Sequence, residues 1–233
     1  MSTRSWLRLG AVCGILSVVL EFGGFGLRAS NSPIGLTIFP PKEQLASAIA
    51  QPTNTAAWVG FYLLALSVFL QFVFMIRVWV RLRGAEGDPP FLAAAALGAQ
   101  GAWLGVTAVS LACQAAVQIR AGQGADVGAA LALTDLTSMT YFLSWAPMAL
   151  FLGVTAAVSL RTRVLPRWLA WSAAGLALLL AVALLAPVSP IAQMPSQLRA
   201  LWILAAGIVL LRQGEEPRPA VNAVRVASSA SAG

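Results

Sequence analysis

Two carboxylates lie inside apolar stretches of the sequence, where a charged group needs a partner or a function. Glu21 interrupts the apolar run from Leu9 to Leu27, and Asp135 lies about six residues into a later run that starts near Ala129. A charge at the centre of a membrane-spanning helix costs roughly 2.5–3.5 kcal/mol. At a rise of about 1.5 Å per residue, both carboxylates are expected about 10 Å deep in the outer half of a bilayer.

Other polar residues are expected at a similar height on neighbouring spans. Gln114 and Gln118 precede Arg120, and Arg28 follows Glu21 by two helical turns, so Arg28 and Arg120 are alternative partners for the carboxylates. One hypothesis is an outward-facing polar cavity, with Arg28 or Arg120 at its mouth and with these residues: Glu21, Arg28, Gln114, Gln118, Arg120 and Asp135. The alternative is that the same side chains only fix helix register through ion pairs and hydrogen bonds. Gln71 and Gln100 lie deeper, and we expect each to bond to a neighbouring helix.

No motif for catalysis or for cofactor binding is present. The chain has no histidine, which excludes histidine-ligated haem, histidine-containing zinc motifs and histidine-based triads. GxSxG, HExxH and Walker motifs are also missing. Cys13 and Cys113 read as apolar fillers that do not pair, so we expect no catalytic residues, cofactor or metal. An enzyme that uses Glu21 or Asp135 on a lipid is the weakest hypothesis.

Composition points to lipid as the main solvent. Of 233 residues, 59% are hydrophobic and 10% are charged, whereas soluble domains have about 45–50% apolar and about 25% charged residues. The net charge of +7 comes from arginines clustered between apolar runs, which is typical of a membrane surface and predicts no nucleic-acid partner.

The pattern predicts an all-α, polytopic transmembrane bundle in a single domain over residues 1–213. The expected spans are residues 9–28, 56–80, 91–119, 129–160, 168–186 and 196–212. The first run competes with a signal peptide, but Glu21 and a poor cleavage site favour a retained span. Pro147 is expected to kink the fourth span. The outer loop 29–55 holds a short amphipathic helix after Pro41, either as a turn of the loop or on the membrane surface, and residues 214–233 are expected to be a disordered cytoplasmic tail.

The distribution of basic residues predicts that both termini are cytoplasmic in a bacterial inner membrane. With the N-terminus inside, the cytoplasmic side holds eleven basic residues: Arg4, Arg8, Arg77, Arg81, Arg83, Arg161, Arg163, Arg167, Arg212, Arg218 and Arg225. The outer side holds four: Arg28, Lys42, Arg120 and Arg199. This excess follows the positive-inside rule.

Small residues recur at four-residue spacing, as in Gly10 with Gly14, Gly101 with Gly105, and Gly153 with Ala157. Such faces serve helix packing within the chain, or a homo-oligomer or membrane partner. We therefore expect a non-enzymatic, membrane-embedded binding, partner or assembly protein in contact with lipid. The alternative is a small transporter or permease-like protein with an outward-facing cavity around Glu21 and Asp135, for which the sequence names no ligand.

Two short motifs mark helix starts at the cytoplasmic surface. They are Arg8-Leu9-Gly10 before the Gly-rich first span and Leu165-Pro166-Arg167-Trp168-Leu169 before the fifth. With the layout of the spans, they make the chain resemble the small bacterial six-span integral-membrane proteins that are grouped as a domain of unknown function. The resemblance implies a six-helix membrane bundle and brings no known site.

Overall fold

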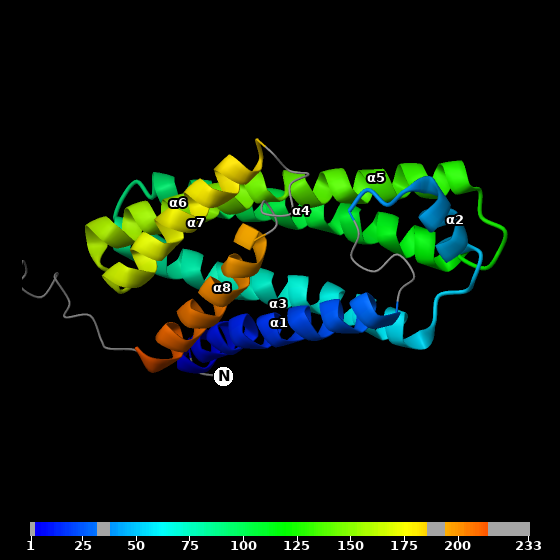
Figure 1. The fold of residues 1–233 in the computed structure, drawn as a ribbon. Helices are drawn as coiled ribbons and strands as arrows, with labels where there is room; N and C mark the ends of the chain where they lie inside the picture. The colour runs from blue at the N-terminus through cyan, green and yellow to red at the C-terminus, as the bar shows by residue number, and fades with distance from the viewer. Residues whose placement is uncertain (1–2, 32–37, 186–193, 214–233) are drawn as a thin grey trace, which may run out of the picture.

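Every regular secondary-structure element in the described part of the chain is a helix, which confirms the predicted all-α class (Figure 1). The computed structural model describes residues 3–31, 38–185 and 194–213. Its helices are α1 (Thr3–Asn31), α2 (Lys42–Ile49), α3 (Thr55–Glu86), α4 (Phe91–Arg120), α5 (Val127–Leu143), α6 (Trp145–Thr162), α7 (Arg167–Ala183) and α8 (Met194–Arg212). The expected tail, residues 214–233, lies outside the described residues.

Most of these helices have the length and apolarity of membrane spans. Five segments qualify: Arg8–Asn31, Thr55–Glu86, Phe91–Arg120, Val127–Thr162 and Met194–Arg212. The apolar helix α7 is shorter, with 17 residues. Large apolar side chains on the outside of the bundle, such as Phe69, Trp171 and Leu178, are each more than 60% exposed. Apolar surface spread over whole helices is typical of a membrane-embedded protein.

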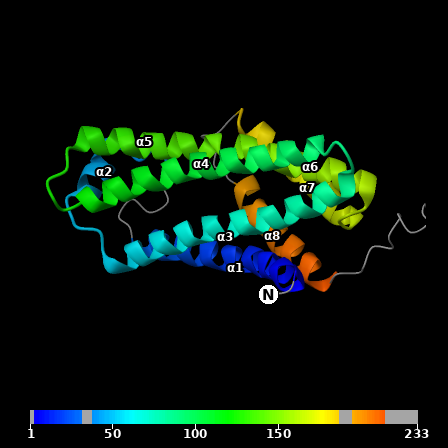
Figure 2. The same ribbon diagram turned by 180° about the vertical axis from the view of Figure 1, so that it is seen from behind.

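The helices form two layers, visible in both views of the ribbon (Figures 1 and 2). In one layer α1 packs along α3 and against α8, and in the other α4 packs against α5 and α6, with α7 on α6. Contacts of α3 with α4 and of α7 with α8 join the layers. This arrangement brings helices from both ends of the chain together, since α1 and α8 are in contact.

Glycine lets α1 and α3 approach closely. A Cβ atom added to Gly24 would lie 2.8 Å from the backbone oxygen of Gly60, and one added to Gly10 would lie 2.7 Å from Cβ of Arg77. Real Cβ atoms do not come so close, so these contacts require glycine. By contrast, an added Cβ at Gly101 or Gly105 on α4 would meet nothing within 4 Å. Of the predicted small-residue faces, the first therefore packs inside the chain and the second faces outward.

The third small-residue pair also lies in a packed interface. A Cβ atom added to Gly153 would be 3.8 Å from Cβ of Ala177, at the contact of α6 with α7. The helix that follows Pro41 packs in a similar way: Leu45, Ala48 and Ile49 of α2 are buried, and α2 contacts α4 and α5. The apolar face of α2 is thus covered by protein.

Side-chain caps define where several helices begin. The side chain of Asn54 accepts a hydrogen bond of 2.7 Å from the backbone N–H of Ala57, and Asp126 accepts one of 2.8 Å from that of Ala129. The carboxylate of Glu86 accepts from the backbone N–H groups of Leu92 and Ala93, both at 2.7 Å. Each cap satisfies donors that the first turn leaves free.

The long helical segment Val127–Thr162 is interrupted at Ser144, which separates α5 from α6. The predicted kink residue, Pro147, lies three residues later, in the first turn of α6. A proline ring cannot donate a hydrogen bond and clashes with the carbonyl four residues earlier, here that of Leu143. The break therefore lies one turn before the proline.

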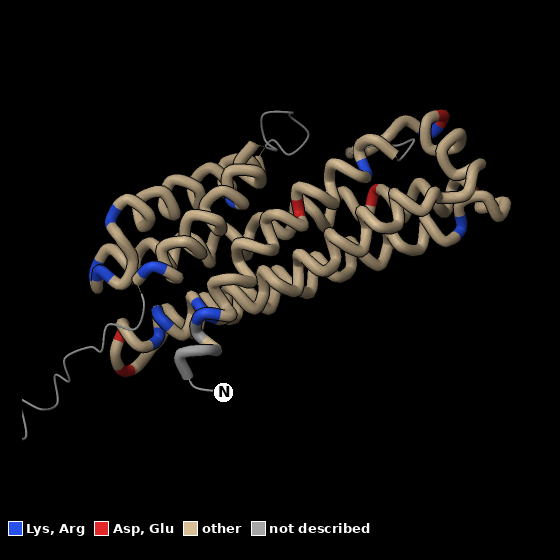
Figure 3. Tube along the Cα trace, turned by 90° about the horizontal axis from the view of Figure 1, so that it is seen from below, with Lys and Arg blue, Asp and Glu red and all other residues tan. Residues whose placement is uncertain are grey.

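Basic residues gather at the end of the bundle that holds the N-terminus (Figure 3). At this end α1 begins, α3 ends, the α6–α7 connection turns, and α8 ends. It holds Arg8, Arg77, Arg81, Arg83, Arg161, Arg163, Arg167 and Arg212. The opposite end, around α2, holds few basic residues, such as Lys42 and Arg120.

Candidate functional site

A cavity lies between the two helix layers. It encloses about 850 Å³ of space free of protein atoms, including the part open to the surroundings, and residues of α1, α3, α4, α5, α6, α7 and α8 line it together with Ser144. Most of its wall surface is apolar, and the aromatic rings of Phe25, Trp103, Tyr141 and Trp145 contribute to it, although more than half of the lining residues are polar. A mostly apolar surface with polar groups set into it is typical of small-molecule sites.

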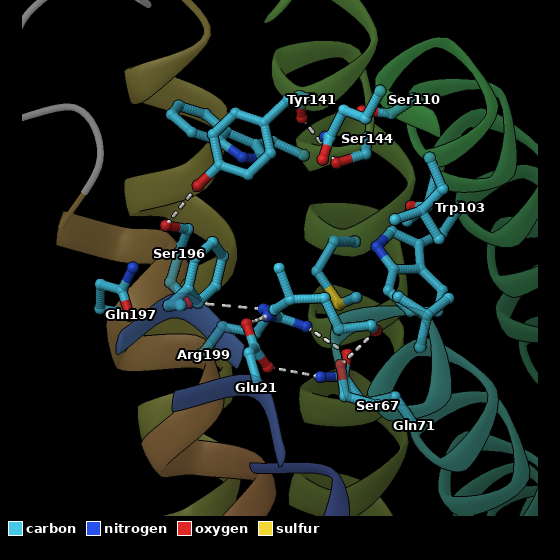
Figure 4. Close-up of a pocket in the computed structure, with 18 of the residues that line it drawn as sticks. Glu21, Ser67, Gln71, Trp103, Ser110, Tyr141, Ser144, Ser196, Gln197 and Arg199 are labelled. Atoms are coloured by element: carbon cyan, nitrogen blue, oxygen red, sulfur yellow. Dashed lines mark hydrogen bonds and ion pairs between the residues drawn. The ribbon is translucent and has the colours of Figure 1, made fainter. Parts of the chain in front are cut away.

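Three polar side chains close a triangle on one wall of the cavity (Figure 4). The guanidinium of Arg199 on α8 forms an ion pair of 2.5 Å with Glu21 on α1. The amide of Gln71 on α3 donates to the second oxygen of Glu21 and accepts from Arg199, both at 2.5 Å. We refer to Glu21, Gln71 and Arg199 as the polar triad.

The polar triad is buried near the middle of the helix bundle. Gln71 lies at the middle of α3, and Glu21 is 7% and Gln71 1% exposed. Each oxygen of Glu21 accepts one hydrogen bond, Oε1 from Arg199 and Oε2 from Gln71. The buried carboxylate thus joins α1, α3 and α8 through its two partners.

Two side-chain hydrogen bonds cross between the layers at the cavity. The hydroxyl of Tyr141 on α5 donates to that of Ser196 on α8 at 2.9 Å. Arg28 on α1 donates from Nη1 to the amide oxygen of Gln114 on α4. A Cβ atom added to Gly60 would lie 2.9 Å from Cγ of Arg28, so the stem of Arg28 lies across α3 at this glycine.

Several buried polar atoms at the cavity have no hydrogen-bond partner in the described part of the chain. They are Nε of Arg28, Oγ1 of Thr107 and Nε1 of Trp145. Buried polar atoms in native proteins are nearly always bonded to protein or to water. The cavity wall therefore offers hydrogen-bonding capacity, most of it as donors, to whatever occupies the space.

The structure brings together three of the six residues predicted for the polar cavity. Glu21, Arg28 and Gln114 line it, whereas Gln118, Arg120 and Asp135 do not. Gln118 and Arg120 lie beyond Gln114 toward the end of α4. Asp135 precedes the lining residue Tyr141 by six positions, or about 9 Å along α5. Of the two carboxylates in the cavity hypothesis, Glu21 therefore lies in the lining and Asp135 outside it.

The partner of Glu21 also differs from the sequence-based expectation. Neither Arg28 nor Arg120 pairs with it. The partner is Arg199, which lies inside the predicted span 196–212 and was expected at the outer side. Arg199 lies within α8, more than one turn after its start at Met194. The sequence feature that could have pointed to Arg199 is its position inside the last apolar run. Its pairing with Glu21 depends on how α8 packs against α1, which the sequence does not show.

The two deep glutamines behave differently. Gln71 bonds to two neighbouring helices, as predicted. For Gln100 the prediction is wrong: it is 1% exposed, and neither amide atom has a hydrogen-bond partner among the described residues.

The aromatic residues of the cavity could not be singled out from the sequence, because aromatic rings in apolar helices are typical of any protein core.

Metal binding finds no support in the described residues, where no group of three or more His, Cys, Asp or Glu side chains could hold an ion. Cys13 and Cys113 are buried and free. Neither the protein-family models, the curated proteins nor the solved structures that were searched give a match to this chain. The site must therefore be interpreted from its own geometry.

Proposed function

We propose that this chain is a six-span integral membrane protein that binds a small molecule in the cavity between its helix layers. The observation that carries the proposal is the cavity itself, with an aromatic wall and three unsatisfied buried polar atoms, on Arg28, Thr107 and Trp145. Binding is the step that a transporter-like protein also requires. The proposed site includes Glu21, as the sequence-based hypothesis did. It also includes Gln71 and Arg199, and it does not include Asp135.

Helix length and charge support the membrane placement. Besides the five long segments, α7 with its 17 residues would reach about 26 Å, close to the roughly 30 Å of a hydrocarbon core. The concentration of arginine at one end (Figure 3) supports an orientation with that end, and both termini, in the cytoplasm of a bacterial inner membrane.

In this orientation the cavity faces outward. Its lining residues Leu180, Ser196 and Gln197 come from the last turn of α7 and the first turn of α8. Both of these helix ends lie away from the arginine-rich end. A ligand would therefore enter from the outer side.

Cysteine labelling tests whether the cavity admits a small molecule. In a background with Cys13→Ala and Cys113→Ala, we place a single thiol in the cavity with Ser110→Cys. Because Ser110 lines the cavity, we expect uncharged methyl methanethiosulfonate to label this thiol in the purified, folded protein, as measured by intact mass.

The matched control is Ser17→Cys, because Ser17 is 0% exposed and does not line the cavity. Its thiol should remain unlabelled over the same time. Failure to label the thiol of the Ser110 variant in folded protein, or equal labelling of both thiols, would contradict an accessible cavity.

A second candidate function is association with a membrane partner through α4. The observation in its favour is the open small-residue face at Gly98, Gly101 and Gly105, where an added Cβ would meet nothing within 4 Å. Small-residue faces allow close helix contact in lipid. Oxidative cross-linking of Gly101→Cys in native membranes should trap a dimer or one reproducible neighbour, and a chain that stays monomeric under these conditions would count against this role.

A further inference from the structure

The charges around the cavity do not balance. Glu21 and Arg199 neutralise each other in the polar triad. Arg28 is the third charged residue of the lining, and its hydrogen-bond partner is the neutral amide oxygen of Gln114. In the described part of the chain no carboxylate forms an ion pair with Arg28. The cavity therefore carries one net positive charge.

The position of Arg28 is set by backbone packing. Its stem crosses Gly60, where an added Cβ would come within 2.9 Å of Cγ, and its Nη1 bonds to Gln114 on α4. A guanidinium has five donors in a planar fork, and Nε of Arg28 is among the buried atoms without a partner. The fork matches the geometry of carboxylate, sulfonate and phosphate groups.

The other two buried polar atoms without a partner at the cavity can also donate hydrogen bonds to a ligand. The indole N–H of Trp145 can only donate, and the hydroxyl of Thr107 can donate or accept. An acceptor-rich ligand would satisfy all three groups, while a cationic ligand would meet only repulsion from Arg28. Trp103, Tyr141 and Trp145 offer rings for an apolar or aromatic body.

We propose that the cavity binds an organic anion, with its acidic group paired with Arg28 and its apolar body against the aromatic wall. This inference rests on the proposed binding function and names the class of ligand. A soluble aromatic carboxylate and the phosphate of an anionic lipid share this chemistry.

The charge is tested with the thiol of the Ser110→Cys variant as a reporter. Ser110 lies one helical turn before Gln114, the partner of Arg28. We compare its reaction rates with anionic sulfonatoethyl and cationic trimethylammonioethyl methanethiosulfonate. The ratio of the two rates cancels changes in thiol reactivity. We expect this ratio to exceed that of the exposed thiol in Gln123→Cys by about tenfold or more.

Variants of Arg28 test whether this residue causes the faster reaction with the anionic reagent. Arg28→Gln should lower the rate ratio about tenfold, whereas Arg28→Lys, which keeps the charge, should retain most of it. The matched control is Arg120→Gln, since Arg120 is exposed and outside the cavity lining; it should leave the ratio unchanged. An equal preference for both reagents in the parent protein, or a preference that survives Arg28→Gln, would overturn the inference.

Protection experiments identify the source of the anion. Labelling of the Ser110 variant should be slowed by 2-naphthoate and not by neutral 2-naphthamide if the ligand is soluble, or by phosphatidylglycerol and not phosphatidylcholine in reconstituted bilayers if it is a lipid. Protection by neither anion would overturn the assignment. Failure of the uncharged reagent to label the thiol would instead contradict the proposed binding function, so the two failures are distinct.

Discussion

At the scale of single residues, the polar triad shows how the bundle accommodates buried charge. Glu21 is paired with Arg199, and its second oxygen accepts from Gln71. Desolvation of two ions is costly, so such a pair adds little net stability compared with an apolar replacement. Removal of one partner is a different matter, because it leaves the other charge buried without compensation.

This asymmetry predicts a non-additive pair of substitutions. Glu21→Gln and Arg199→Gln should each lower the free energy of unfolding by about 3–5 kcal/mol. The double variant should be destabilised by less than the sum, with a coupling of about 0.5–3 kcal/mol. The measurement is an unfolding titration of the purified protein with sodium dodecyl sulfate in mixed micelles.

Glu43→Gln is the control, because Glu43 is an exposed carboxylate on α2. Its effect should stay within about 0.5 kcal/mol. Strict additivity of the two substitutions in the polar triad would show that the ion pair contributes no coupling to folding.

At the scale of elements, the contact of α1 with α3 depends on missing side chains. Gly24 and Gly60 each bring an α-carbon so close that a Cβ atom would meet the other's backbone oxygen at 2.8–2.9 Å. In lipid, helix association depends on close packing rather than on the hydrophobic effect. The same contact directs Arg28 across α3, so helix packing and the position of the cavity charge are linked.

Enlarging a glycine on this contact should destabilise the fold. Gly24→Leu is expected to lower the free energy of unfolding by about 1–3 kcal/mol, because the overpacked helices must move apart. Gly101→Leu introduces the same side chain on α4 into open space, and it should leave the monomer unchanged or slightly more stable, since glycine disfavours helix.

The unfolding titration used for the ion pair separates the two glycine variants. An equal loss of stability in Gly24→Leu and Gly101→Leu would mean that the cost comes from glycine replacement in general and not from the contact of α1 with α3.

At the scale of the whole molecule, the cavity lies where the two helix layers face each other. Arg28 with Gln114 and Tyr141 with Ser196 cross between the layers at the cavity. The triad, by contrast, lies within the layer of α1, α3 and α8. A movement of one layer relative to the other would therefore change the cavity while leaving the ion pair intact.

The proposed orientation predicts which ends of the bundle react with an impermeant reagent. In the cysteine-free background, Gln123→Cys between α4 and α5 should be labelled by an impermeant maleimide in intact spheroplasts. Thr162→Cys at the arginine-rich end should react only after the membrane is permeabilised. Both positions are exposed, so access to the protein surface does not distinguish them.

The opposite labelling pattern would invert the orientation and turn the cavity toward the cytoplasm. Labelling of both cysteines from outside would contradict six spans.

The sequence alone determined the helical class, because mean apolarity and run length are properties of the chain that hold in any packing. It also identified Gln71, Glu21 and Arg28 as polar groups within apolar helices, since their cost in lipid is local. The sequence alone did not determine which of these polar groups pair with each other. Whether Glu21 meets Arg28, Arg120 or Arg199 depends on the axial offset and rotation of α1 against α8, which no local pattern contains.

Only the tertiary structure decided that Arg199 neutralises Glu21 and that Asp135 lies outside the cavity lining. It also decided that Gln100 is buried with no hydrogen-bond partner among the residues that the structure describes. The physical reason is that small differences in helix height decide which side chains meet. One turn moves a side chain by about 5.4 Å, more than the reach of a hydrogen bond. These contacts also set the charge of the cavity. Because Glu21 pairs with Arg199, Arg28 is the charge that a ligand would neutralise.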